Sequence, residues 1–305
     1  MQTIGTPSPR RRLVAGADGS GAAKLIVFFI GAYALAWLPF AVPILAARGL
    51  ILLPAPETVF LTLATLGIGL AGVGMAAWES GGAGVRSLLG QILRWRVRPI
   101  WYVAAVLVPA LFPAGAFLLG LALGNPPTPT ASPQVWLSIP LVLVAFLVPA
   151  LLEEIGWRGY ALPRLQRLLG RLLASVVLGV IWAGVHLPLW LLPDFGFASQ
   201  SVTVYFVQVV AISVVLAWLY NATGGSLLLT GLAHAAVNGW PMPWNAALQA
   251  LPDQRRGVAV ADFHVLITLA TVVVAVLVVL ATRRPSRADT RQTPLDGMRA
   301  AAPLD

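Results

Sequence analysis

Cysteine is absent from this chain, and charged residues make up only 10% of it. The absence of cysteine excludes disulfides, thiolate nucleophiles, iron–sulfur clusters and thiolate zinc sites. Only 11 acidic residues and 3 histidines occur in 305 residues. Any chemistry that the protein performs must therefore come from oxygen and imidazole groups.

Apolar residues are abundant instead: 58% of the chain is hydrophobic and its mean hydropathy is +0.84. This composition is typical of a polytopic membrane protein, so we predict an all-α integral membrane fold. A helix needs about 20 apolar residues to cross a hydrocarbon core of ~30 Å. Eight such runs are present, at about 24–46, 58–78, 100–123, 136–153, 172–192, 202–220, 226–249 and 262–282. Gly239, Pro241 and Pro243 interrupt the seventh run, so we expect its regular part to stop near Asn238.

The basic residues predict the topology. With eight spans, all but three of the 20 Lys and Arg residues fall on one side of the membrane; the three exceptions are Arg48, Arg255 and Arg256. The positive-inside rule then places both termini in the cytoplasm of a multi-pass plasma-membrane protein. The net charge of +9 follows from this topology, so we expect a lipid bilayer as partner and no nucleic acid. Residues 23–283 are predicted to form one transmembrane domain between disordered cytoplasmic tails at 1–22 and 284–305.

Two adjacent carboxylates, Glu153 and Glu154, end an apolar run in the stretch LLEEIGWRGY at 151–160. Ionisable groups at membrane depth are costly unless they are paired or reach a water-filled cavity, and they often mark functional sites. Glu154 and Arg158 are four residues apart and share a helix face, which predicts a structural ion pair. Glu153 points elsewhere and is expected to face a cavity.

Two further segments carry buried polar groups: IWAGVHLPLW at 181–190 contains His186, and GLAHAAVNGW at 231–240 contains His234 and Asn238. A single histidine in a membrane helix is more often an interhelical hydrogen bond than a catalyst, and Trp182 fits a packing role. Together, however, an acid, two imidazoles and an amide match the needs of water activation and oxyanion stabilisation.

These groups can meet only if their depths agree. His186 lies 15 residues after Arg171, or ~22 Å along a helix. Glu153 reaches the same depth if the fourth helix continues to about Leu162 and the fifth begins a few residues after Arg171. We therefore predict one site, within the membrane and open to the cytoplasm.

The motifs resemble those of the CPBP family, the CAAX-protease and bacteriocin-processing proteins, also called Abi. EEIGWR fits Glu-Glu-x-x-x-Arg, WAGVH fits aromatic-x-x-x-His, and HAAVN fits His-x-x-x-Asn, in the family's order, over a core of about 135–240. One departure is Trp182, where the prenyl-protein proteases usually have phenylalanine.

The resemblance implies an intramembrane endopeptidase that acts on a membrane-associated peptide or protein. Glu153 would act as general base on a water oriented by His186, and His234 and Asn238 would stabilise the oxyanion. Glu154 and Arg158 would support the site.

A metal-dependent mechanism stays open at this point. His186, His234 and Glu153 are a plausible zinc set, so the protease could be of the metallo type or the glutamate type. We favour the glutamate type, because an amide beside His234 suits an oxyanion better than zinc. A proton-coupled transporter and a non-proteolytic scaffold are the alternative functions, since buried Glu, His and Asn also form proton relays.

Overall fold

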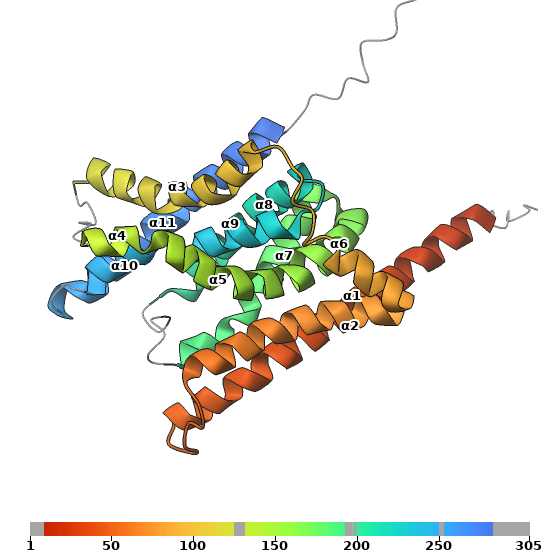
Figure 1. The fold of residues 1–305 in the computed structure, drawn as a ribbon, viewed down its shortest axis with the longest axis horizontal. Helices are drawn as coiled ribbons and strands as arrows, with labels where there is room; N and C mark the ends of the chain where they lie inside the picture. Colours follow the sequence, from red (N-terminus) through yellow and green to blue (C-terminus); the bar gives the residue numbers. More distant parts are fainter. Residues whose placement is uncertain (1–8, 125–131, 193–196, 198–199, 250–252, 283–305) are drawn as a thin grey trace, which may run out of the picture.

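The computed structural model describes the chain except for residues 1–8, 125–131, 193–196, 198–199, 250–252 and 283–305. Every regular element in the described part is helical, as predicted (Figure 1). The α-helices are α1 (Pro9–Ala47), α2 (Glu57–Leu89), α3 (Ile100–Ala122), α4 (Pro133–Leu137), α5 (Ile139–Glu154), α6 (Leu162–Leu169), α7 (Arg171–Val185), α8 (Val202–Ala222), α9 (Leu227–Gly239), α10 (Met242–Gln249) and α11 (Asp253–Thr282). A π-helix, η1 (Ile155–Ala161), joins α5 to α6, and a 3-10 helix, η2 (Leu187–Leu191), follows α7.

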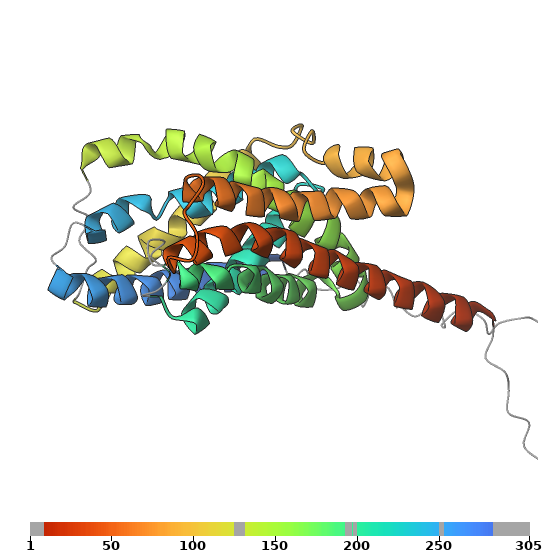
Figure 2. The ribbon, with the colours of Figure 1, turned by 90° about the horizontal axis from the view of Figure 1, so that it is seen from below.

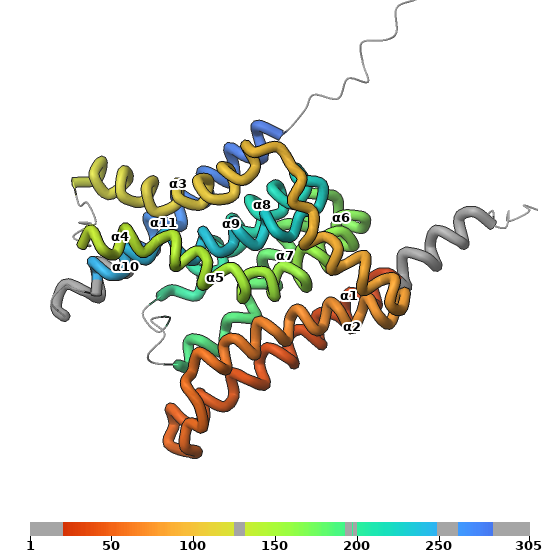
Figure 3. The backbone as a smooth tube through the Cα atoms, viewed as in Figure 1, coloured from red at the N-terminus to blue at the C-terminus, as the bar shows by residue number. Residues whose placement is uncertain are grey.

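Seven segments within the described residues are long and apolar enough to cross a membrane, which confirms a polytopic membrane fold. The seventh predicted run, at 226–249, is divided: α9 has 13 residues and α10 begins after a break at Trp240 and Pro241. α9 alone is ~20 Å long, which is short of the hydrocarbon core. α9 and α10 lie between α8 and α11 in the chain, where the sequence predicted one regular span (Figure 3).

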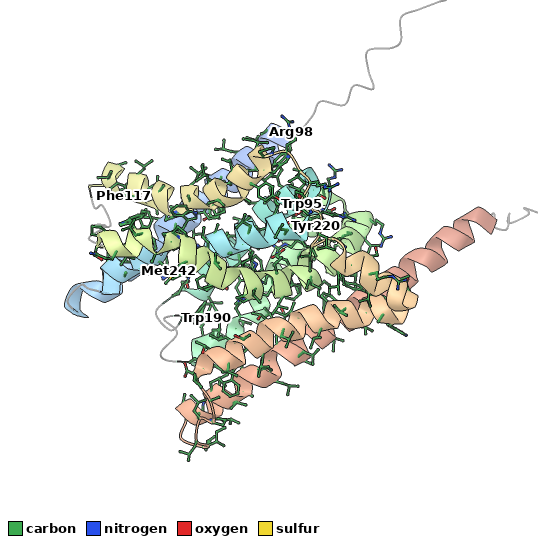
Figure 4. The ribbon with its side chains drawn as sticks, viewed as in Figure 1. Trp95, Arg98, Phe117, Trp190, Tyr220 and Met242 are labelled. Carbon is green, nitrogen blue, oxygen red and sulfur yellow. The ribbon has the colours of Figure 1, made fainter. Side chains whose placement is uncertain are left out.

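The two ends of the bundle differ in their residues. Arg98, Trp95 and Tyr220 lie toward one end, whereas Phe117, Met242 and Trp190 lie toward the other (Figure 4).

The described chain begins with a helix at Pro9, which reaches into the segment predicted as an N-terminal tail and contains helix formers such as Ala, Leu and Arg. The C-terminal tail predicted at 284–305 lies outside the described residues.

Helix α2 is kinked where Ser80 and Gly81 leave helical geometry. Gly81 has a φ of +56°, a conformation that glycine adopts without steric cost. The last part of α2 therefore turns back at the end of the bundle (Figure 2).

Helices α1 and α2 hold η1 from one side. Gly156 of η1 lies so close to α2 that a Cβ atom on it would be 2.7 Å from the Ile68 carbonyl oxygen. Small residues allow membrane helices to approach this closely. On α1, the Phe28 ring meets the buried Trp157 ring at 5.9 Å, edge to face. The segment that carries Arg158 thus packs closely against the pair of helices α1 and α2.

The other side of the site is formed by a second group of helices. α5 packs against α9, α7 packs against α8, and α8 and α3 both pack against α11. In Figure 1, α9 lies in the middle of this group, between α5 and α8. This arrangement brings the three polar segments of the sequence, on α5 and η1, α7 and α9, to one place.

Candidate active site

Glu153 and Glu154 are the last two residues of α5, directly before the π-helix η1. Pro149 precedes them and Pro163 follows at the start of α6. Proline lacks an N–H group, so a helix that contains it departs from the regular ladder, and π turns inside α-helices often occur at functional sites. The helical path continues to Leu169, which confirms the extension that the depth argument required. α7, however, begins at Arg171 itself, without the expected delay, because Gly170 with φ +75° turns the chain directly into the new helix.

The predicted ion pair is present. Arg158 donates from Nη1 to Glu154 Oε1 at 2.9 Å, and both side chains have 0% exposure. Such a pair must be kept intact, since an uncompensated buried charge is strongly destabilising. Glu154 and Arg158 therefore form a buried structural pair that supports the other site residues.

His234 is bonded to the same carboxylate oxygen. Its Nδ1 lies 2.9 Å from Glu154 Oε1, and the ring is 3% exposed. The sequence predicted a pairing of Glu154 with Arg158 alone and assigned His234 to the site of Glu153. The structure instead links α9 to α5 through Glu154.

Glu153 is not a free acid, because Trp182 Nε1 donates a hydrogen bond to Glu153 Oε2 at 2.9 Å. Both side chains are buried, Glu153 with 8% exposure and Trp182 with 3%. The interpretation of Trp182 as a packing residue therefore missed its polar role. Trp182 lies four residues before His186, and residues four apart share a helix face. This spacing was the signal that could have predicted that Trp182 faces the other polar site residues.

The Trp182 ring lies among the other site residues. The Arg158 guanidinium stands 4.5 Å from its centroid, in the range of a cation–π contact. The His234 and His186 rings meet it edge-on at 5.0 and 6.2 Å. One side chain thus contacts the acid, the ion pair and both histidines.

His186 caps the C-terminal end of α7 and is partly buried. Its Nδ1 lies 2.9 Å from the Trp182 carbonyl oxygen. A carbonyl only accepts, so Nδ1 carries the hydrogen and a neutral ring keeps a lone pair on Nε2. Tyr205 of α8 packs edge-on against the ring at 5.8 Å.

Asn238 is placed differently from the other candidates. It lies one turn beyond His234 on α9, but its side chain is exposed. Within the described part of the chain, no hydrogen bond joins it to Glu153 or to either histidine. The structure therefore brings five of the six predicted residues together and leaves Asn238 at the exposed edge.

The cluster combines two carboxylates with one guanidinium and two imidazoles. Glu154 Oε2 and Arg158 Nη2 have no hydrogen-bond partner within the described protein, although both are buried. Buried polar atoms normally find partners, so these atoms are available to water or to a bound molecule.

A complete set of zinc ligands is not found among the described residues. Catalytic zinc is normally held by three protein ligands, and no group of three or more His, Cys, Asp or Glu residues in the described parts of the chain is arranged to hold a metal ion. The tentative ligands His186 and His234 thus lack a third partner here.

Residues 134–240 match the family model described as Type II CAAX prenyl endopeptidase Rce1-like. The chain is also 28% identical over 103 residues to "CAAX prenyl protease 2" of Methanococcus maripaludis. That alignment covers 32% of this chain and 38% of the relative, so the chain spans well under half the length of the curated protein that it matches. The matched segment contains all six candidate residues and Trp182. These findings confirm the resemblance to the CAAX-protease family.

Proposed function

We propose that this membrane protein, whose residues 134–240 carry the core of the CAAX-protease family, is an intramembrane endopeptidase of the glutamate type. The observation that carries the proposal is the buried cluster around Trp182, which holds Glu153, Glu154, Arg158, His186 and His234 within the matched segment. Buried ionisable groups in membrane helices are costly, and a shared chemical task explains their concentration at one place.

Glu153 acts as the general base in this mechanism. A water molecule donates one hydrogen to the Glu153 carboxylate and the other to the lone pair on His186 Nε2. Glu153 accepts the first proton as the water oxygen attacks the peptide carbonyl carbon. The same proton then passes to the leaving amine, so the carboxylate is regenerated.

The attack places negative charge on the former carbonyl oxygen. A His234 ring that carries a hydrogen on both nitrogens can donate from Nε2 to this oxyanion while its Nδ1 stays bonded to Glu154 Oε1. Asn238, one turn away on α9, supplies an amide donor from the exposed edge when substrate covers it. Oxyanion donors of this kind contribute strongly because they are oriented before the reaction.

Glu154 and Arg158 support these groups. Glu154 fixes the orientation of His234, and Arg158 compensates the Glu154 charge while its guanidinium covers the Trp182 ring. Both side chains are fully buried, so they support the site from within rather than contacting the substrate.

The substrate class follows from the membrane setting and the family. We propose a membrane-associated peptide or protein, and the printed name of the archaeal relative suggests prenylated proteins as the first class to test. The basic residues favour a plasma-membrane protein with both termini in the cytoplasm. A transporter or a scaffold is less favoured, because no observation beyond the polar residues supports either one.

Cleavage of a quenched fluorescent peptide with a farnesylated CAAX end tests the proposal in purified, reconstituted protein. Glu153→Gln should lower kcat about 10²–10⁴-fold, the usual contribution of a positioned acid or base. Glu57→Gln removes a carboxylate at the start of α2, outside the site, and should leave the rate unchanged. Equal rates in wild type and Glu153→Gln would refute the glutamate mechanism, and wild-type cleavage of only the peptide without farnesyl would refute the prenylated class.

A further inference from the structure

A continuous groove runs along α8 between α7 and α11, away from the candidate active site. Its apolar part is a cavity of about 620 Å³ lined by 172–180 of α7, 206–214 of α8 and 272–280 of α11. Ala211 and Ala275, each 6% exposed, line it where larger side chains would fill it. A second cavity of about 790 Å³ continues it toward one end of the bundle. The two share three lining residues: Leu172, Val214 and Val279.

The polar groups of this groove are confined to the second cavity. Arg171, Asn221 and Thr282 line it together with Trp101 and Trp218. The two indole rings pack edge to face at 5.6 Å. Tryptophans of membrane proteins gather at the membrane–water interface, so this end of the groove lies at headgroup level. The lining thus changes along the groove from interfacial to purely apolar.

The length of the apolar part matches one leaflet. Positions 172–180 extend over ~12 Å of helix, and the segments lining the groove from α8 and α11 have nearly the same length. Half of the hydrocarbon core is ~15 Å. The groove therefore suits a chain that enters from the interface and reaches toward the middle of the bilayer.

Arg171 gives the interfacial end its charge. The side chain is exposed and has no ion-pair partner in the described part of the protein. This end is also the one that the positive-inside rule assigns to the cytoplasm, where the bilayer surface is negative. An anionic headgroup would supply the missing counter-charge.

We propose that this groove binds one anionic phospholipid, with its phosphate beside Arg171 and one acyl chain along α8. Water-soluble anions fit less well, because the apolar cavity continues directly from the charged end. The inference does not depend on protease activity, since lipid binding can be measured without a substrate.

Native mass spectrometry of the full chain in mild detergent tests the headgroup site, with palmitoyl-oleoyl phosphatidylglycerol and phosphatidylcholine as probes. Wild type should retain one phosphatidylglycerol more strongly than phosphatidylcholine. Arg171→Gln should weaken phosphatidylglycerol binding about fivefold, the effect of one basic residue near an anionic surface. The matched control Arg167→Gln changes an exposed arginine of α6 that does not line the groove, and should bind like wild type. Equal losses in both variants would overturn the proposal in favour of general surface charge.

A second pair of variants tests the apolar part. Val276, 49% exposed, lines the groove, and Val273, 55% exposed, lies on the same helix but does not line it. Val276→Trp should reduce the binding of both lipids, and Val273→Trp should not. Undiminished binding in Val276→Trp would show ordinary annular lipid and overturn the proposal, as would displacement of the lipid by a farnesylated peptide. Thermal unfolding of each variant identifies any loss that comes from misfolding, and the smaller obstruction Val276→Phe then replaces a tryptophan variant that does not fold.

Discussion

The bond between Trp182 and Glu153 predicts a measurable energetic coupling. Trp182→Phe keeps an aromatic ring beside Arg158 and His234 but removes the indole N–H that donates to Glu153 Oε2. A hydrogen bond to a charged group contributes about 1.5–3 kcal/mol, and a carboxylate left unsatisfied in a buried site loses at least that much. Since Glu153 is only 8% exposed, water replaces the lost donor poorly.

The free energy of unfolding, measured by SDS titration in mixed micelles, gives this coupling through a double-mutant cycle. The cycle compares wild type, Trp182→Phe, Glu153→Leu and the double variant, and we expect a coupling of about 1.5–3 kcal/mol. Trp190→Phe is the matched control, because Trp190 Nε1 donates to the neutral Gln200 carbonyl at 2.9 Å. It should cost about 0.5–1.5 kcal/mol and show no coupling to Glu153.

The same variant separates a positioning role from a packing role. If Trp182 orients the Glu153 carboxylate, folded Trp182→Phe protein should have a lower kcat with a nearly unchanged KM. A packing residue would lower the yield of folded protein and leave kcat per folded molecule intact. A coupling below about 0.5 kcal/mol, with normal kcat, would refute the role assigned to the bond.

Three further predictions concern the rest of the site. Glu154→Gln should destabilise the protein by about 3–5 kcal/mol, because it strands the buried Arg158 charge, and normal abundance and unfolding would contradict this. Gly156→Ala should lower thermal stability because its Cβ would meet the Ile68 carbonyl, whereas Gly74→Ala, with open space around it, should not; equal behaviour of the two would argue against the close helix contact. Exhaustive chelation should leave cleavage intact, and the treated protein should contain well under one zinc per chain. Stoichiometric zinc whose removal abolishes cleavage would overturn the glutamate mechanism.

The predicted spans agree with the structure where composition alone decides the helix. The runs at 100–123 and 202–220 correspond to Ile100–Ala122 and Val202–Ala222. The run that ended at Glu153 fell short, because the helical path continues through charged residues to Leu169. A span predicted from hydropathy ends at such charges. The helix itself continues, because the ion pair between Glu154 and Arg158 compensates the buried charges. The pairing of Glu154 with Arg158 was predictable, since it depends only on local helix geometry.

The contacts between segments that are distant in the sequence could not be predicted, for a different physical reason. His234 and Glu154 are 80 residues apart, and their contact depends on how α9 is rotated about its own axis against α5. That rotation is set by packing, for example by Gly231, where a Cβ atom would stand 2.6 Å from the Leu151 side chain. The motifs alone do not define this rotation, so they suggested a contact of His234 with Glu153. Because the packing of α9 on α5 directs His234 to Glu154, Glu153 is bonded to Trp182 instead. In the proposed mechanism, that arrangement leaves Glu153 as the acid that activates water, and the close contact at Gly231 is one of the contacts that maintain it.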